Sequence, residues 1–140
     1  MPADVTSVPV EFLFTMIANL SAPMVAGAGP KGTRVIIGVT GGSVKGPKVN
    51  GELLPPGGDW VHAGADGTLT LDVRALIKTD DGAVILMTYA GKGVNGAIRT
   101  APTFETGDER YAWLNGVQAV ATGAIVDAGA AVEYEVYRVL

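Results

Sequence analysis

The 140-residue sequence contains no cysteine and a single histidine, His62. Without cysteine the chain can form neither a disulfide nor a thiolate zinc site, and it has no cysteine nucleophile. One histidine also excludes metal sites built from several histidines of one chain. Since no cofactor-binding motif is present either, we expect neither a metal nor a cofactor.

Charged residues are also few, at 17% of the chain against 48% hydrophobic residues, which is typical of a folded protein. The net charge is −4 and the basic residues are scattered, which argues against a nucleic-acid partner because such partners need clustered Lys and Arg. No apolar run approaches eighteen residues, so no membrane span is expected. The start, MPADVTSVPVEF, does not resemble a signal peptide, and we expect a cytoplasmic protein.

Twenty glycines and eight prolines separate short segments with the alternation or β-branching of strands. Two pairs of segments, 69–79 with 83–90 and 116–126 with 131–140, read as hairpins. One short helix is expected over 107–115, with Asp108 as its N-cap. The pattern predicts a single all-β domain over residues 1–140: a closed antiparallel β-barrel of about eight strands, with the helix plugging one end and residues 1–7 as a flexible lead.

The stretch GGSVKGPKVNGELLPPGGDW, residues 41–60, is rich in glycine and proline but is not a phosphate loop, because Pro47 occupies the position of the required lysine. Asp59 and Trp60 follow its last glycines. Either Asp59 caps a turn and Trp60 lies in the core, or the two residues supply an acid/base group and a stacking wall at a barrel mouth.

Two further carboxylates allow alternative interpretations. Asp72 and Arg74 share one face of a predicted strand, and they form either a surface ion pair on the outer wall or a charged pair in the lumen. Glu105 lies among the aromatic residues of segment 104–113, either as a helix-capping carboxylate or as a desolvated acid with a raised pKa.

Together these segments resemble the family called domain of unknown function 3237, also known as uncharacterised protein family 0311. The resemblance covers roughly residues 8–140 and rests on Gly-Gly-x-x-x-Gly-Pro, Gly-Gly-Asp-Trp, Asp-x-Arg and Tyr-x-Trp-Leu-Asn elements in this order. It implies a small barrel of lipocalin-like (calycin-like) architecture and no assigned activity for the family as a whole. The polar and aromatic character of the matching positions implies a pocket and favours Arg74 inside it. Those positions are Gly41, Gly42, Gly46, Pro47, Asp59, Trp60, Asp72, Arg74, Phe104, Glu105, Tyr111, Trp113 and Asn115.

The sequence therefore predicts a cofactor-independent acid/base enzyme, a lyase, hydratase or isomerase, acting on a small carbonyl-bearing or hydroxy-aromatic compound. Asp59 would be the general acid or base and Arg74 would stabilise an oxyanion, with Tyr89 or Tyr111 as a second donor. The expected substrate-binding residues are Trp60, Phe104, Glu105, Trp113 and Asn115. Two alternatives are a non-catalytic carrier or sensor barrel and a structural oligomer subunit. A homodimer is possible in each case.

Overall fold

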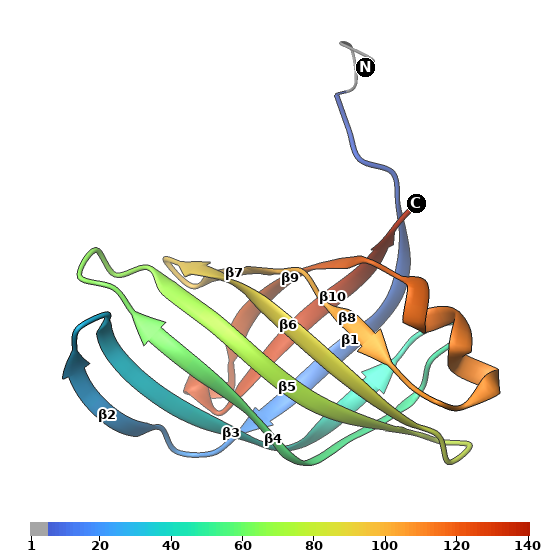
Figure 1. The fold of residues 1–140 in the computed structure, drawn as a ribbon, viewed down its shortest axis with the longest axis horizontal. Helices are drawn as coiled ribbons and strands as arrows, with labels where there is room; N and C mark the ends of the chain where they lie inside the picture. The colour runs from blue at the N-terminus through green and yellow to red at the C-terminus, as the bar shows by residue number, and fades with distance from the viewer. Residues whose placement is uncertain (1–5) are drawn as a thin grey trace.

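The structure, a computed structural model, describes residues 6–140, so most of the expected N-terminal lead lies outside the described residues (Figure 1). It consists of strands and two short 3-10 helices, which are, in chain order, β1 (Val10–Leu20), β2 (Met24–Gly29), β3 (Gly32–Lys45), β4 (Gly51–Ala63), β5 (Leu69–Thr79), β6 (Val84–Val94), β7 (Ala97–Thr100), β8 (Thr103–Glu105), η1 (Glu109–Gly116), β9 (Ala119–Val126), η2 (Asp127–Gly129) and β10 (Ala131–Val139). No helix among these residues is long and apolar enough to cross a membrane.

Eight strands close into an antiparallel barrel in the order β1-β10-β9-β7-β6-β5-β4-β3, and β1 also pairs with β3 to complete the ring. β2 extends the sheet beside β3, and β8 pairs with β6. Gly42 lies in the closing pair with φ +145°, where a Cβ atom would collide with the carbonyl oxygen of Ile17. Closure removes most free strand edges. The predicted closed barrel of about eight strands is confirmed.

The predicted helix is also confirmed, as the 3-10 helix η1. Asp108 is its N-cap, and the Asp108 carboxylate accepts a hydrogen bond of 2.9 Å from the Arg110 backbone N–H. Tyr111 and Leu114 turn inward and are buried. Figure 1 shows η1 at one end of the barrel, opposite the turns that join β2 to β3, β4 to β5 and β6 to β7.

The two ends of the barrel interior differ in packing. Toward η1 the interior is solid, because large side chains fill it: Phe14, Met16, Leu53, Ile77, Ile85, Met87 and Leu114 are fully buried. Phe14 and Phe104 meet edge to face with ring centroids 6.0 Å apart. Toward the opposite, open end the interior contains a cavity whose lining includes the exposed side chains of Val25 and Ile125.

Candidate functional site

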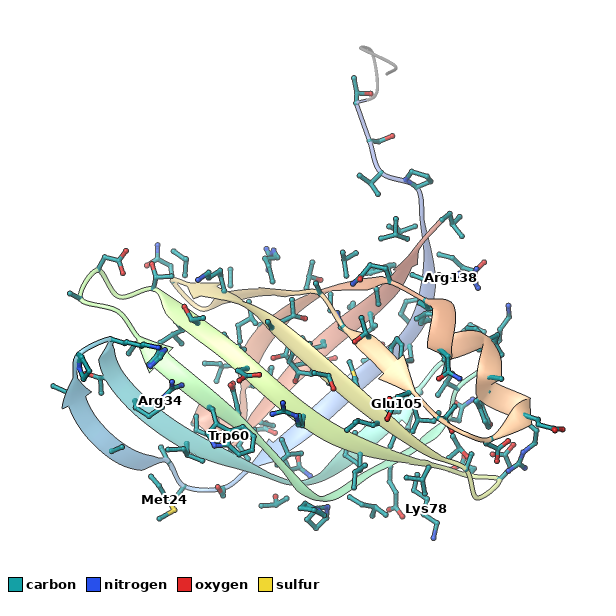
Figure 2. All side chains as sticks on the ribbon, viewed as in Figure 1. Met24, Arg34, Trp60, Lys78, Glu105 and Arg138 are labelled. Atoms are coloured by element: carbon teal, nitrogen blue, oxygen red, sulfur yellow. The ribbon has the colours of Figure 1, made fainter. Side chains whose placement is uncertain are left out.

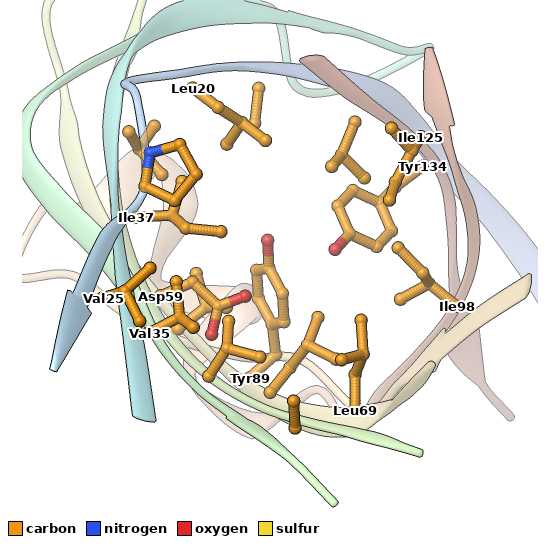
Figure 3. A pocket seen from close by; sticks show the side chains of 18 residues that line it. Leu20, Val25, Val35, Ile37, Asp59, Leu69, Tyr89, Ile98, Ile125 and Tyr134 are labelled. Atoms are coloured by element: carbon orange, nitrogen blue, oxygen red, sulfur yellow. The ribbon is translucent and has the colours of Figure 1, made fainter. Parts of the chain in front are cut away.

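A cavity of about 320 Å³ occupies the open half of the barrel (Figure 3). This volume lies at the lower end of the range typical of small-molecule sites. Among the described residues that line it, only Asp59, Tyr89 and Tyr134 carry polar side-chain atoms. The others are aliphatic: Ala18, Leu20, Pro23, Val25, Val35, Ile37, Val39, Val61, Ala63, Leu69, Leu71, Val73, Ile98, Ile125 and Val132.

Asp59 reaches the cavity because β4 is irregular just before it. The β4–β5 register shifts between Leu54 and Gly58, across the Pro-Pro-Gly stretch, and regular pairing resumes at Gly58 opposite Arg74, so that Asp59 lies opposite Val73. From there the two-residue period of the strand directs Asp59 inward and Trp60 outward. The Asp59 carboxylate is held in place by a hydrogen bond of 3.0 Å from the Asp72 backbone N–H. The sequence predicted Asp59 and Trp60 together at the barrel mouth, whereas the structure places Asp59 inside the cavity and Trp60 outside it.

Burial changes the acidity of Asp59. Removal from water raises its pKa from 3.8 to about 6, the negative charge of Asp72 adds to the rise, and the Asp72 N–H hydrogen bond opposes it. A carboxyl group with this pKa exchanges its proton close to neutral pH, which is the property required of a general acid or base.

Two tyrosines face the same cavity. Tyr89 and Tyr134 meet edge to face with ring centroids 5.5 Å apart, and their hydroxyl groups point into the cavity (Figure 3). Burial raises the pKa of Tyr89 well above its ordinary value and that of Tyr134 to about 12, and the charge of Asp59 contributes to both shifts. Both phenols therefore remain protonated hydrogen-bond donors at neutral pH. Gly123 makes room for the Tyr134 ring, which a Cβ atom there would strike.

Arg74 does not join these groups, and its predicted placement in the lumen is wrong. On β5 the inward side chains are Leu71, Val73 and Ala75, so Asp72 and Arg74 alternate with them and are exposed on the outer wall. Water solvates a guanidinium there at no desolvation cost, whereas an aliphatic cavity would not. The prediction of an arginine that stabilises an oxyanion in the lumen is therefore corrected.

Tyr111 is likewise outside the cavity. It lies in η1 at the closed end, where its hydroxyl donates to both carboxylate oxygens of Asp81 at 2.9 Å. Asp81 also accepts from the Thr79 hydroxyl at 2.5 Å, and Arg110 pairs with it at 3.3 Å. Tyr111 thus ties η1 to the β5–β6 turn, and its predicted role as a catalytic donor is corrected to a structural one.

None of the five predicted substrate-binding residues lines the cavity. Trp60 is 41% exposed on the outer wall, and Figure 2 shows it away from Glu105, which is exposed on β8 nearer to η1. Phe104 packs in the solid core. The Asn115 side chain accepts a hydrogen bond from the Thr106 backbone N–H and donates one to the Thr106 carbonyl oxygen. Trp113 lies beneath two cations, with Lys48 Nζ 5.6 Å and the Arg138 guanidinium 6.0 Å from its ring. These residues stabilise the closed end or cover the surface.

Tyr134 is the polar cavity residue that the sequence analysis did not select. It alternates along β10 with Val132 and Val136, which are both buried. A tyrosine between two valines on a predicted inward face is the sequence signal that could have identified it, since a buried phenol usually needs a polar partner.

The comparisons with known proteins agree with this architecture. The family model described as "Protein of unknown function (DUF3237)" matches residues 8–97 and 92–139. The chain belongs to this family. A UPF0311 protein of Rhodopseudomonas palustris is 32% identical over 122 residues, which cover 74% of this chain and 80% of that protein. A protein of Penicillium herquei named hydroalkoxylation enzyme phnH is 35% identical over 115 residues, covering 81% of this chain and 72% of that one.

A solved structure from Acinetobacter baumannii, described as a beta-barrel like protein, superposes with a TM-score of 0.90 at 28% identity and covers 99% of both chains. The family and the fold are thus established for this DUF3237 protein.

Proposed function

We propose that this DUF3237 protein is an acid/base enzyme that moves a proton within a small hydroxy-aromatic or carbonyl-bearing compound held in the barrel cavity. The observation that carries the proposal is a single desolvated carboxylate, Asp59, facing two tyrosine hydroxyls in a cavity otherwise lined by aliphatic side chains. Perturbed acid/base groups in such a cavity are typical of catalytic sites.

Asp59 is the proton carrier in this proposal. With a pKa of about 6 it is mostly ionised at pH 7, so it can accept a proton from a substrate hydroxyl and then deliver the proton to carbon. Tyr89 and Tyr134 donate hydrogen bonds to the negative charge that develops on the substrate oxygen. They take the role predicted from the sequence for Arg74.

The printed name of the Penicillium relative supports this class of reaction. Hydroalkoxylation adds an O–H bond across a carbon–carbon double bond. The O–H bond breaks, a C–O bond and a C–H bond form, and no electrons are gained or lost. The same two proton transfers, from oxygen and to carbon, are those that Asp59 can perform.

The test uses 2-(3-methylbut-2-enyl)phenol, which cyclises by adding its own hydroxyl across its alkene. Conversion is followed by ¹H NMR in D₂O, where delivery of a solvent-exchanged proton to carbon places one deuterium in the product. We expect Asp59→Asn to slow conversion at least about 100-fold, because general acid/base groups contribute 10²–10⁴-fold. The Asn side chain retains an oxygen that can accept from the Asp72 N–H, so the fold should persist.

Asp80→Asn is the matched control, because it removes an exposed carboxylate from the β5–β6 turn outside the cavity. It should convert the phenol at the parent rate. Equal rates for Asp59→Asn and the parent would overturn the proposal.

The mainly aliphatic lining favours a second candidate, a non-catalytic barrel that carries or senses a small apolar ligand. In that case native mass spectrometry would detect a retained ligand, and incubation of the parent with alkenyl phenols would yield no deuterated product.

A further inference from the structure

We infer that the cavity takes an uncharged amphiphile head first, with a hydroxyl or carbonyl head against Asp59, Tyr89 and Tyr134 and an apolar tail pointing out of the barrel. The inference rests on the proposed function only in placing the reacting group at Asp59. It adds the orientation of the substrate, its lack of charge and its apolar tail, which the proposed reaction alone leaves open.

The polar groups lie at the inner end of the cavity. Asp59 precedes Ala63, the last residue of β4, by four positions, which corresponds to about 13 Å along the strand from the barrel mouth. Asp59, Val73 and Tyr89 pair across three neighbouring strands, and the Tyr89 ring meets the Tyr134 ring edge to face. We call Asp59, Tyr89 and Tyr134 together the polar row.

Immediately below this row the interior is solid. Met87 lies two residues beyond Tyr89 on β6, and Val136 lies two residues beyond Tyr134 on β10. Both are fully buried. A ligand therefore cannot extend past the polar row, and any part of it that does not fit there must point toward the mouth.

Between the polar row and the mouth, the wall is an aliphatic belt, which we define as Leu20, Val25, Val35, Leu69, Ile98 and Ile125. A ligand tail in this belt would find no polar partner. Two members of the belt are open to water at the rim, Val25 at 66% and Ile125 at 49% exposure. An apolar tail that reaches the rim would cover both side chains, and the burial of this apolar surface would favour binding.

The charge of the head group follows from the same lining. Asp59 is the single charged residue among the described cavity residues, so an anionic head would meet a carboxylate and no cation. A cationic head would have to give up its hydration for one carboxylate whose burial already disfavours ionisation. A neutral hydroxyl can donate to Asp59 and accept from a tyrosine, which satisfies each group.

The experiment measures dissociation constants by isothermal titration calorimetry for 4-ethyl-, 4-butyl- and 4-hexylphenol, together with 4-hexylbenzoate and 4-hexylbenzylamine. The phenol series should gain about fourfold in affinity per buried methylene. The benzoate and the benzylamine should each bind at least tenfold more weakly than 4-hexylphenol. Affinity independent of chain length, or a charged head that binds as tightly as the phenol, would overturn the inference.

Two variants test the orientation. Ile125→Thr changes an exposed rim residue and should weaken 4-hexylphenol severalfold while leaving 4-ethylphenol unchanged. Tyr89→Phe removes one head contact and should weaken both phenols by the same factor, about fivefold. The opposite pattern, in which Ile125→Thr weakens both ligands and Tyr89→Phe only the longer one, would show a ligand bound tail first.

These measurements are independent of turnover. Chain-length dependence without conversion would retain the inference and reject the enzyme, whereas conversion that depends on Asp59 without chain-length dependence would reject the inference and retain the enzyme.

Discussion

Replacing Asp59 with asparagine should make the folded protein more stable at pH 8, although the same change should slow the proposed reaction at least about 100-fold. The reason is that burial in the cavity disfavours the charged form of Asp59 and raises its pKa from 3.8 to about 6. At pH 8 the carboxyl group is nevertheless ionised, and this buried charge destabilises the fold. An asparagine of nearly the same shape can still accept the Asp72 N–H hydrogen bond without carrying a buried charge.

The expected magnitude follows from linkage between protonation and folding. Moving a carboxyl pKa from 3.8 to about 6 corresponds to about 3 kcal/mol of lost stability when the group is fully ionised. Because Asp59 is only partly buried, solvent screening reduces this to about 1–2 kcal/mol. Below pH 3.8 the carboxyl is protonated in both states and costs nothing, so the penalty develops as pH rises from about 4 to 6 and is complete above that.

The assay is urea denaturation of the parent and Asp59→Asn between pH 4 and pH 8. The difference in unfolding free energy should be near zero at pH 4 and reach about 1–2 kcal/mol in favour of the variant at pH 7 and above. Asp80→Asn, which removes an exposed turn carboxylate outside the cavity, is measured in parallel as the control for an Asp-to-Asn substitution. A pH-independent difference for Asp59→Asn, or a less stable variant at pH 8, would refute the reasoning.

Three further predictions concern catalysis, the closed end and the barrel seam. Since in the proposed reaction the ionised form of Asp59 accepts the proton, kcat/KM measured against pH should rise through about pH 6, and a midpoint near pH 4 would contradict this role. Tyr111→Phe removes a hydrogen bond to a carboxylate and should lower the unfolding free energy in urea by about 1 kcal/mol; an unchanged urea midpoint would show that the tie contributes nothing. Gly42→Ala places a Cβ against the Ile17 carbonyl at positive φ and should cost at least about 2 kcal/mol, measured by thermal unfolding. Gly107→Ala, where the Cβ meets open space, should stay within about 0.5 kcal/mol of the parent, and equal losses for the two variants would contradict the strained closure.

The strand pattern was sufficient to predict the barrel, because alternation and turn residues report local backbone geometry directly. The predicted hairpin over 69–79 and 83–90 corresponds to β5 and β6, and Asp108 caps η1 as expected. The long strand β4 was harder to predict, since its proline and glycine residues are typical of loops, and here they form an irregular stretch inside a paired strand.

The site residues were predicted less completely, because side-chain period identifies two faces of a strand without stating which face is inside. Asp72 and Arg74 were correctly assigned to one face, opposite Leu71 and Val73, but the family resemblance favoured the wrong side for them. If the more hydrophobic face of the strand is simply taken as the inner one, Asp72 and Arg74 are predicted to lie on the outer wall. Asp59 points inward only because the register of β4 shifts just before it. The sequence pattern does not show this shift, so the burial of Asp59 among aliphatic side chains could not be predicted.

The cavity itself could not be predicted from residue types. Valine and leucine line the hollow half and also occur in the solid half, where Leu53 and Val136 are fully buried. What differs is the size of the facing side chains and the distance between strands, and both depend on long-range packing.

The most direct test of a buried, proton-exchanging carboxylate in the cavity is an NMR titration of the side-chain ¹³C carboxyl signal of Asp59, assigned by its absence in Asp59→Asn. We predict a midpoint at about pH 6. A midpoint near the ordinary value of 3.8 would show a solvated carboxylate and would contradict the proposed site.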